Sequence, residues 1–254
     1  MIAQLKEIAV SAGNKILEYY GDRRTVEVKS DQSPLTQADL SSHKLICEAL
    51  VDLDPEIPVL SEESSEEEID QRLSWNRLWV VDPLDGTKEF IKQSGQFTVN
   101  IALVEGGETV LGVVYAPAIK TMYWAERGAG AFRSEDNDAA VAIRTRTPDR
   151  SKLSIVASRD HAGPQVAALL ARFPEAETRS MGSSLKFCLV AEGKADVYLR
   201  DVPTREWDTA AAQCVVEAAG GGIWDLNGQR LMYNKVDLTN PFLITLGDRD
   251  FQWQ

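Results

Sequence analysis

The stretch Leu78-Trp79-Val80-Val81-Asp82-Pro83-Leu84-Asp85-Gly86-Thr87 is an apolar run that ends on two carboxylates, a glycine and a hydroxyl. Its four apolar residues predict a buried strand, and we expect Pro83 to end it, because proline lacks the N–H group that strand pairing needs. The glycine and the threonine then permit a tight turn into a helix. The sequence therefore predicts two aspartates, Asp82 and Asp85, at the end of a buried strand.

This strand end has the composition of a magnesium site. Asp82, Asp85 and the carbonyl of Leu84 offer hard oxygen ligands within one turn, which are the ligands that Mg²⁺ prefers. The N–H groups of Gly86 and Thr87 are suited to hold an anion beside the metal. A capped turn without a ligand is the alternative, but capping accounts for one carboxylate and not for two. The pattern favours a metal-binding turn.

The composition is that of a globular chain with its own core. The chain has 254 residues, of which 44% are hydrophobic and 26% are charged. Its net charge of −12 argues against binding to nucleic acid or anionic lipid, which require a positive field. Cys47, Cys188 and Cys214 lack paired spacing, which predicts a reducing, cytoplasmic compartment. Residues 1–20 predict an amphipathic helix, not a signal peptide or a membrane span.

The order of the expected elements changes along the chain. The first half predicts helices over 1–20 and 36–53, the second opened by a capping box of Thr36 and Asp39, followed by antiparallel strands. A polar stretch near 146–152 predicts a boundary between a domain of residues 1–148 and one of residues 149–254. The second half alternates, with strands at 153–157, 178–181, 196–199 and 242–246 and helices at 164–172, 184–192 and 208–219. This alternation predicts an α/β layered half.

Two more acidic residues lie at comparable ends of elements. Glu62 follows a strand expected at 57–60, and Asp208 opens the helix expected at 208–219. Capping of that helix is the alternative role for Asp208. Four carboxylates brought together repel one another strongly, so their convergence requires more than one divalent cation.

Three motifs follow one another over nearly the whole chain: Glu62-Glu63, residues 79–87, and Trp207-Asp208 with the run 217–221. Together they resemble the signatures of the inositol monophosphatase family of magnesium-dependent, lithium-sensitive phosphatases. This resemblance implies a fold of alternating α-β-α-β-α layers, of the α/β class, and about two or three Mg²⁺ ions. The metal ligands it implies are Glu62, Asp82, the Leu84 carbonyl, Asp85 and Asp208.

The second half carries the segments that distinguish branches of that family. Residues 158–161 and 182–196 are similar to the bisphosphate nucleotidase branch and less like the inositol branch. This implies removal of the 3'-phosphate from adenosine 3',5'-bisphosphate, with a role in sulfur assimilation and nucleotide recycling. The substrate contacts implied are Glu62, Leu84, Asp85, Gly86, Thr87, Ser158, His161, Ser183, Lys186 and Asp208. A solvated Lys186 and a surface or satisfied His161 are the alternatives.

One segment departs from the family pattern. Residues 200–205 read Arg-Asp-Val-Pro-Thr-Arg, where an arginine, a small residue, glycine, proline and threonine are usual before the Trp-Asp pair. We therefore carry over no nucleotide contact to this segment.

The spacing Asp-x-x-Asp-Gly-Thr also separates the chain from haloacid-dehalogenase-type phosphatases, whose Asp-x-Asp-Gly-Thr motif has a nucleophilic first aspartate. We therefore expect direct attack by water and no aspartyl intermediate. The proton leaves that water either through Thr87 linked to Asp39 or through Glu62, and the sequence does not choose between these routes.

Two other functions share these residues. An inositol or sugar monophosphate phosphatase uses the same metal site, and a noncatalytic phosphonucleotide sensor uses the same fold. We expect a monomer or homodimer that acts on a small molecule. Stable membrane insertion is not expected, although resemblance to bacterial relatives leaves peripheral association with the inner face of the membrane open.

Overall fold

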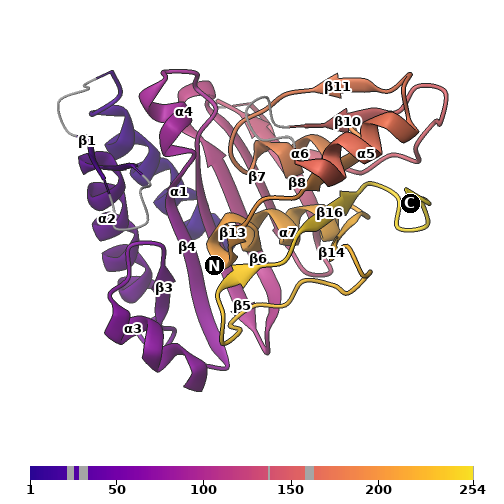
Figure 1. Ribbon diagram of the computed structural model, residues 1–254. Coiled ribbons are helices and arrows are strands. Elements are labelled where there is room, and N and C mark those ends of the chain that lie inside the picture. The colour runs from indigo at the N-terminus through magenta and orange to yellow at the C-terminus, as the bar shows by residue number, and fades with distance from the viewer. Residues whose placement is uncertain (22–25, 29–33, 137, 158–162, 254) are drawn as a thin grey trace.

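The computed structural model describes residues 1–21, 26–28, 34–136, 138–157 and 163–253. Figure 1 shows two stacked sheets with helices between them and on both outer sides. Along the stack lie helices α1 (Ile2–Leu17) and α2 (Gln37–Leu53), a seven-stranded sheet, helices α6 (Leu185–Ala191) and α7 (Ala210–Ala218), a five-stranded sheet, and helix α5 (Pro164–Arg172). The predicted α-β-α-β-α layering is confirmed.

The seven-stranded sheet is built by the first half of the chain. Its strands occur in sequence order, and every pair is antiparallel except β3 with β4. They are β3 (Val59–Ser61), β4 (Arg77–Asp85), β5 (Thr98–Glu105), β6 (Glu108–Ala116), β7 (Thr121–Glu126), β8 (Gly130–Glu135) and β9 (Val141–Ile143). The meander expected from residues 98–126 is confirmed as β5, β6 and β7, and β8 and β9 extend it beyond what the sequence indicated.

Helices α1 and α2 cover one face of this sheet. Buried residues of α1 recur with helical spacing, at Leu5, Ile8, Ala12 and Ile16, and pack against the sheet. Helix α2 begins with the predicted capping box, in which Thr36 accepts the N–H of Asp39 and the Asp39 carboxylate accepts the N–H of Thr36. The short hairpin of β1 (Val26–Val28) and β2 (Pro34–Thr36) precedes it.

Residues 78–81 of strand β4 form an unbroken apolar run because both faces of the strand are buried there. Trp79 and Val81 pack against the core under α1 and α2, whereas Leu78 and Val80 pack against the core under α6 and α7. The expectation that Pro83 ends the strand is wrong, since β4 runs on to Asp85. The pairing with β5 shifts register between residues 82 and 85, so the sheet tolerates a residue without an N–H group there.

The five-stranded sheet is built by the second half of the chain. Its order is β11 (Glu177–Arg179), β10 (Ser154–Val156), β12 (Val197–Arg200), β16 (Leu243–Leu246) and β14 (Gly222–Asp225), with the first three parallel and the others antiparallel. Helices α6 and α7 pack on its inner face and α5 packs on its outer face. The predicted alternation of strands and helices is confirmed. Strand β14 was not predicted, because its residues follow directly on the glycines that end α7.

Short elements complete the chain. They are the helices α3 (Glu66–Gln71) and α4 (Thr87–Ile91), the 3-10 helices η2 (Arg72–Ser74), η3 (Pro117–Ile119) and η4 (Glu206–Asp208), and the paired strands β13 (Thr204–Arg205) and β15 (Thr239–Asn240). The three cysteines are free thiols. Among the described helices none is long and apolar enough to cross a membrane. The division at residues 148 and 149 falls between β9 and β10 and stays a prediction.

Candidate active site

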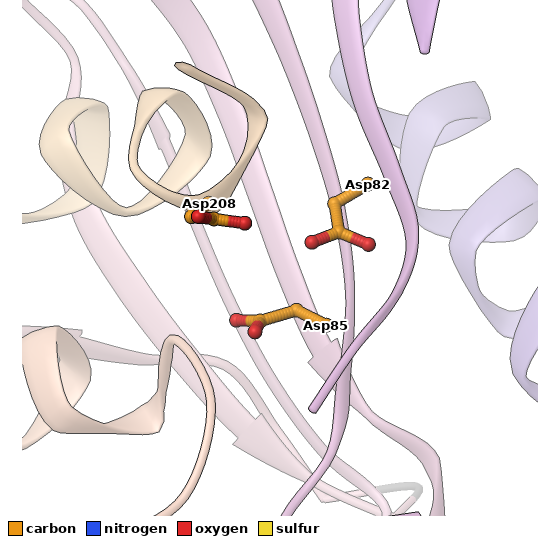
Figure 2. A group of neighbouring side chains, drawn as sticks. All are labelled: Asp82, Asp85 and Asp208. Atoms are coloured by element: carbon orange, nitrogen blue, oxygen red, sulfur yellow. The ribbon is translucent and has the colours of Figure 1, made fainter. Parts of the chain in front are cut away.

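Three aspartates from distant parts of the chain meet at the end of β4. Carboxylate oxygens of Asp82, Asp85 and Asp208 all lie within 4.8 Å of one another. Figure 2 shows the first two carboxylates projecting from β4 toward the third, which lies at the start of the α7 region. Asp82 is buried and the other two are partly exposed. The sequence prediction that Asp208 joins the strand-end pair is thus met by the geometry.

The alternation of β4 aims Asp82 at this point. Leu78 and Val80 face the layer of α6 and α7, and Asp82 is the next residue on that face of the strand. Its Oδ1 accepts the N–H of Leu84 at 3.0 Å, which fixes the carboxylate over the turn. Asp85 is the last residue of β4, and its Oδ2 accepts a hydrogen bond from the Ser184 hydroxyl at 2.8 Å.

Glu62 reaches the same place from the neighbouring strand. It directly follows β3, and its N–H donates to the carbonyl of Val81 at 3.1 Å, which continues the parallel pairing of β3 with β4. Its charge is one of the causes that raise the pKa of Asp82. Glu62 is thus close enough to act on the charge of Asp82, but its carboxylate is not one of the three that lie within 4.8 Å of one another.

Asp208 lies in η4, one residue before the cap of helix α7. The N-cap of α7 is Thr209, so the alternative in which Asp208 caps that helix is wrong. Its Oδ2 instead accepts the N–H of Arg205 at 2.7 Å within the preceding turn. Its main-chain carbonyl lies 2.9 Å from the hydroxyl oxygen of Ser184.

The electrostatics of the cluster fit bound cations. Burial, followed by the charges of Glu62, Asp85 and Asp208, holds the pKa of Asp82 well above its usual range. Burial and the neighbouring Asp85 raise the pKa of Asp208 to about 7. A bound cation would offset the repulsion between these neighbouring carboxylates. All of their donor atoms are oxygens, which hard metal ions prefer. These residues are therefore suited to hold a hard divalent metal ion.

Thr87 and Asp39 are joined across the site. The Thr87 hydroxyl oxygen lies 3.3 Å from Oδ1 of Asp39 and 3.4 Å from the Leu84 carbonyl oxygen, and either oxygen can accept its hydrogen bond. Asp39 is buried, and its Oδ2 is occupied by the N–H and the hydroxyl of Thr36. The capping box of α2 thus fixes the carboxylate that faces Thr87.

Gly86 is required at the turn between β4 and α4. Its φ of +90° is disfavoured for residues with a side chain, and an added Cβ would lie 3.2 Å from Cβ of Ser183 and 3.3 Å from the Gln96 carbonyl. Gly86 and Thr87 open helix α4, so their N–H groups lie at a helix N-terminus, where N–H groups have no partner within the helix. The turn is built for close approach of the second half of the chain.

A small pocket of about 80 Å³ adjoins the acidic cluster and is lined by Asp85, Ser183, Lys186, Phe187, Tyr198, Arg200, Thr204 and Asp208. Lys186 is only 7% exposed, so the alternative of a solvated lysine is wrong, and its Nζ lies 5.8 Å from the ring centroid of Tyr198. The Ser183 hydroxyl and Nε of Arg200 are buried without a hydrogen-bond partner in the described part of the chain. Polar groups of this kind indicate a place for a ligand.

Sequence reasoning missed Arg200 and Ser184. Arg200 ends an apolar strand and is the first residue of the segment that departs from the family pattern, whereas Ser184 lies in a motif of which only Ser183 and Lys186 were proposed as contacts. An arginine at the end of an apolar strand was the available signal for the first, and no local signal marks the second. Ser158 and His161 lie outside the described residues, so their role stays a prediction.

The departure at Asp201 has a structural explanation. Its carboxylate accepts the N–H groups of Gly163 at 3.1 Å, Gln165 at 2.8 Å and Val166 at 3.1 Å, and so caps helix α5. An added Cβ at Gly163 would lie 2.4 Å from an oxygen of this carboxylate. Asp201 stands where a small residue is usual, and its carboxylate holds the start of α5.

Comparison with known proteins finds relatives that all belong to one family. A model of the inositol monophosphatase family matches residues 1–243. The 3'(2'),5'-bisphosphate nucleotidase CysQ of Salmonella typhimurium is 45% identical over 250 residues, which cover 97% of this chain and 100% of the relative. The protein of the same name from Escherichia coli K12 is 44% identical over 244 residues, covering 95% and 97% of the two chains. The crystal structure of CysQ from Bacteroides thetaiotaomicron matches with a TM-score of 0.84 and 40% identity over 96% of each chain.

Proposed function

This chain belongs to the inositol monophosphatase family, and on that premise we propose that it is a magnesium-dependent phosphatase that removes the 3'-phosphate from adenosine 3',5'-bisphosphate. The observation that carries the proposal is the acidic cluster at the end of β4, which directly adjoins a pocket lined by Lys186 and Arg200. The names of the relatives at 44–45% identity support the choice of substrate.

About two or three Mg²⁺ ions are held by Glu62, Asp82, the Leu84 carbonyl, Asp85 and Asp208. When bound, magnesium supplies a more acidic water and withdraws charge from the leaving oxygen. The rest of the chemistry is done by groups of the chain.

Groups of this chain are placed to take the proton from the attacking water and to bind the phosphate oxygens. The Thr87 hydroxyl, 3.3 Å from Asp39, is a route by which the attacking water loses its proton, and this contact supports that route over Glu62. The N–H groups of Gly86 and Thr87 hold phosphate oxygens, where transition-state charge is spread.

The second phosphate and the nucleoside bind on the side of α6. Lys186, Arg200 and Ser183 offer two positive charges and a hydroxyl, and the two charges offset those of Asp85 and Asp208, which line the same pocket. Ser158 and His161 are proposed to complete these contacts. An inositol phosphate has no second phosphate for this pocket, which is why the nucleotide is preferred.

The test compares phosphate release from adenosine 3',5'-bisphosphate and from inositol 1-phosphate, in Mg²⁺ with and without Li⁺. We expect faster turnover of the nucleotide, inhibition by Li⁺, and loss of turnover in Asp82→Asn. Near-normal activity of that variant would remove Asp82 from the metal site. Preference for inositol 1-phosphate would assign the chain to the inositol or sugar phosphatases, and binding without phosphate release would make it a phosphonucleotide sensor.

A further inference from the structure

Glu206 is a fully buried carboxylate two residues before Asp208. It accepts the N–H of Asn234 at 2.6 Å, and its other oxygen accepts the N–H of Lys235 at 2.9 Å and the Lys235 ammonium at 2.6 Å. A buried charge is costly unless it is paired and hydrogen-bonded, and this one has both kinds of partner. The loop at residues 234–236 is thereby fixed to η4.

Arg72 fixes the same loop to the first half of the chain. Its side chain is buried, at 3% exposed, and Nη2 donates to the carbonyls of Lys235 at 2.6 Å and Val236 at 2.8 Å. In return, Nδ2 of Asn234 donates to the carbonyls of Arg72 at 3.0 Å and Trp75 at 2.9 Å. Nη1 of the same guanidinium donates to the carbonyl of Ile69, so its two terminal nitrogens bind the loop and the preceding helix α3 at once.

These contacts form one path, which we call the Arg72–Glu206 network and define as Arg72, Asn234, Lys235 and Glu206. The path begins in η2, which follows Glu62 in the chain, and it ends in η4, which carries Asp208. Together with Glu62 and Asp208, Arg72 lines a groove of about 760 Å³. The network therefore connects η2, which lies in the first half of the chain after Glu62, with η4, which carries Asp208.

We propose that Arg72 is a positioning residue for the metal site, which holds the turn of Asp208 close to the acids of the first half. The inference rests on the proposed function, because it assumes that the cluster binds Mg²⁺. The carboxylates repel one another without metal, and η4 is a single short turn that directly follows β13, a strand paired with β15 over only two residues. A turn without this network withdraws, and metal binding has to draw it back at a cost in affinity.

The test measures Mg²⁺ affinity by calorimetry and by the rise in melting temperature that Mg²⁺ produces. Arg72→Met removes the donors at similar length, and we expect its dissociation constant for Mg²⁺ to rise about tenfold or more, with Arg72→Lys in between. Val236→Ala is the matched control, because that side chain is 83% exposed while its carbonyl stays in the network. Its affinity should equal that of the wild type.

A purely structural role predicts a different result. It lowers the melting temperature of the metal-free protein and leaves the Mg²⁺ dissociation constant within about twofold of the wild type, and this outcome for Arg72→Met would overturn the proposal. If that variant does not fold, Asn234→Gly tests the same path, since glycine accepts the φ of 58° while the two side-chain donors are lost. Unchanged affinity in Asn234→Gly also overturns it. Wild-type protein that binds no Mg²⁺ overturns the proposed function as well.

Discussion

The hydroxyl oxygen of Ser184 lies 2.8 Å from Oδ2 of Asp85 and contacts the acidic cluster from both halves of the chain. The same oxygen is 2.9 Å from the main-chain carbonyl of Asp208 and accepts the Asn100 amide at 2.9 Å. Ser184 is buried, so water does not replace these bonds. One side chain at the start of α6 thus orients an aspartate of β4 and supports the turn that carries the other.

Ser184→Ala should therefore weaken the metal site without disturbing the core. We expect a drop in kcat of about tenfold to a hundredfold and a higher Mg²⁺ requirement, because ligand-orienting hydrogen bonds contribute on that scale. Initial rates at a series of Mg²⁺ concentrations measure both effects. Ser11→Ala, on the exposed side of α1, is the control, and equal kinetics in the two variants would contradict this role.

The metal-free protein should lose stability as the pH rises. The pKa of Asp208 is raised from 3.8 to about 7, first by burial and then by Asp85, so between these values the folded chain keeps a proton that the unfolded chain releases. The contribution of this group is complete below pH 3.8 and is lost as the pH rises through about 7. Its size is on the order of a few kcal/mol at most.

Urea unfolding in chelator at about pH 5.5, which lies within this range, and at about pH 7.5, which lies above it, measures the effect. The free energy of unfolding of Asp208→Asn should fall less between the two pH values than that of the wild type. Mg²⁺ should make the fall in the wild type smaller, because the cation replaces the proton. Identical falls in the wild type and Asp208→Asn would show that this carboxyl does not carry the pH dependence.

Lys186→Ala should impair recognition of the bisphosphate. Loss of a charge-assisted contact raises KM by about tenfold to a hundredfold, whereas KM for a simple sugar monophosphate changes little. Lys194→Ala is the matched control, since that lysine follows the same helix and its side chain is 51% exposed. An equal rise of KM for both substrates would remove Lys186 from recognition of the second phosphate.

Asp201→Ala should destabilise the fold and spare the metal site. The carboxylate caps α5 through three N–H groups, and loss of a cap costs about 1–2 kcal/mol of unfolding free energy. Urea denaturation measures the loss, with the exposed Asp52→Ala as the reference. The Mg²⁺ dissociation constant should not change. A larger dissociation constant would place Asp201 in the metal site instead.

The sequence predicted the parts of this site that have a local signature. The unbroken apolar run before Asp82 reflects burial of both faces of β4, and glycine at position 86 reflects a φ of +90°. Asp39 was recognised because it belongs to a capping box. Each of these motifs is contained within a few consecutive residues, so it can be recognised from the sequence alone.

The missed residues depend on pairing between distant segments. Arg72 is one charged residue after an acidic helix, and only the fold shows that it is buried against carbonyls of residues 235 and 236. Arg200 and Ser184 likewise gain their meaning from strands and helices that are far away in sequence. Pro83 was misjudged because the register shift beside it is a property of the strand pair and not of β4 alone.

The division of the acidic cluster between the two halves has a consequence for biosynthesis. A nascent chain presents Glu62, Asp82 and Asp85 long before the ribosome adds Asp208, so the full ligand set first exists when the five-stranded sheet has closed over α7. If the cluster binds metal as proposed, the complete site can bind it only after Asp208 has been placed. Cellular magnesium should protect the finished protein from unfolding and proteolysis, while truncated chains gain little of that protection.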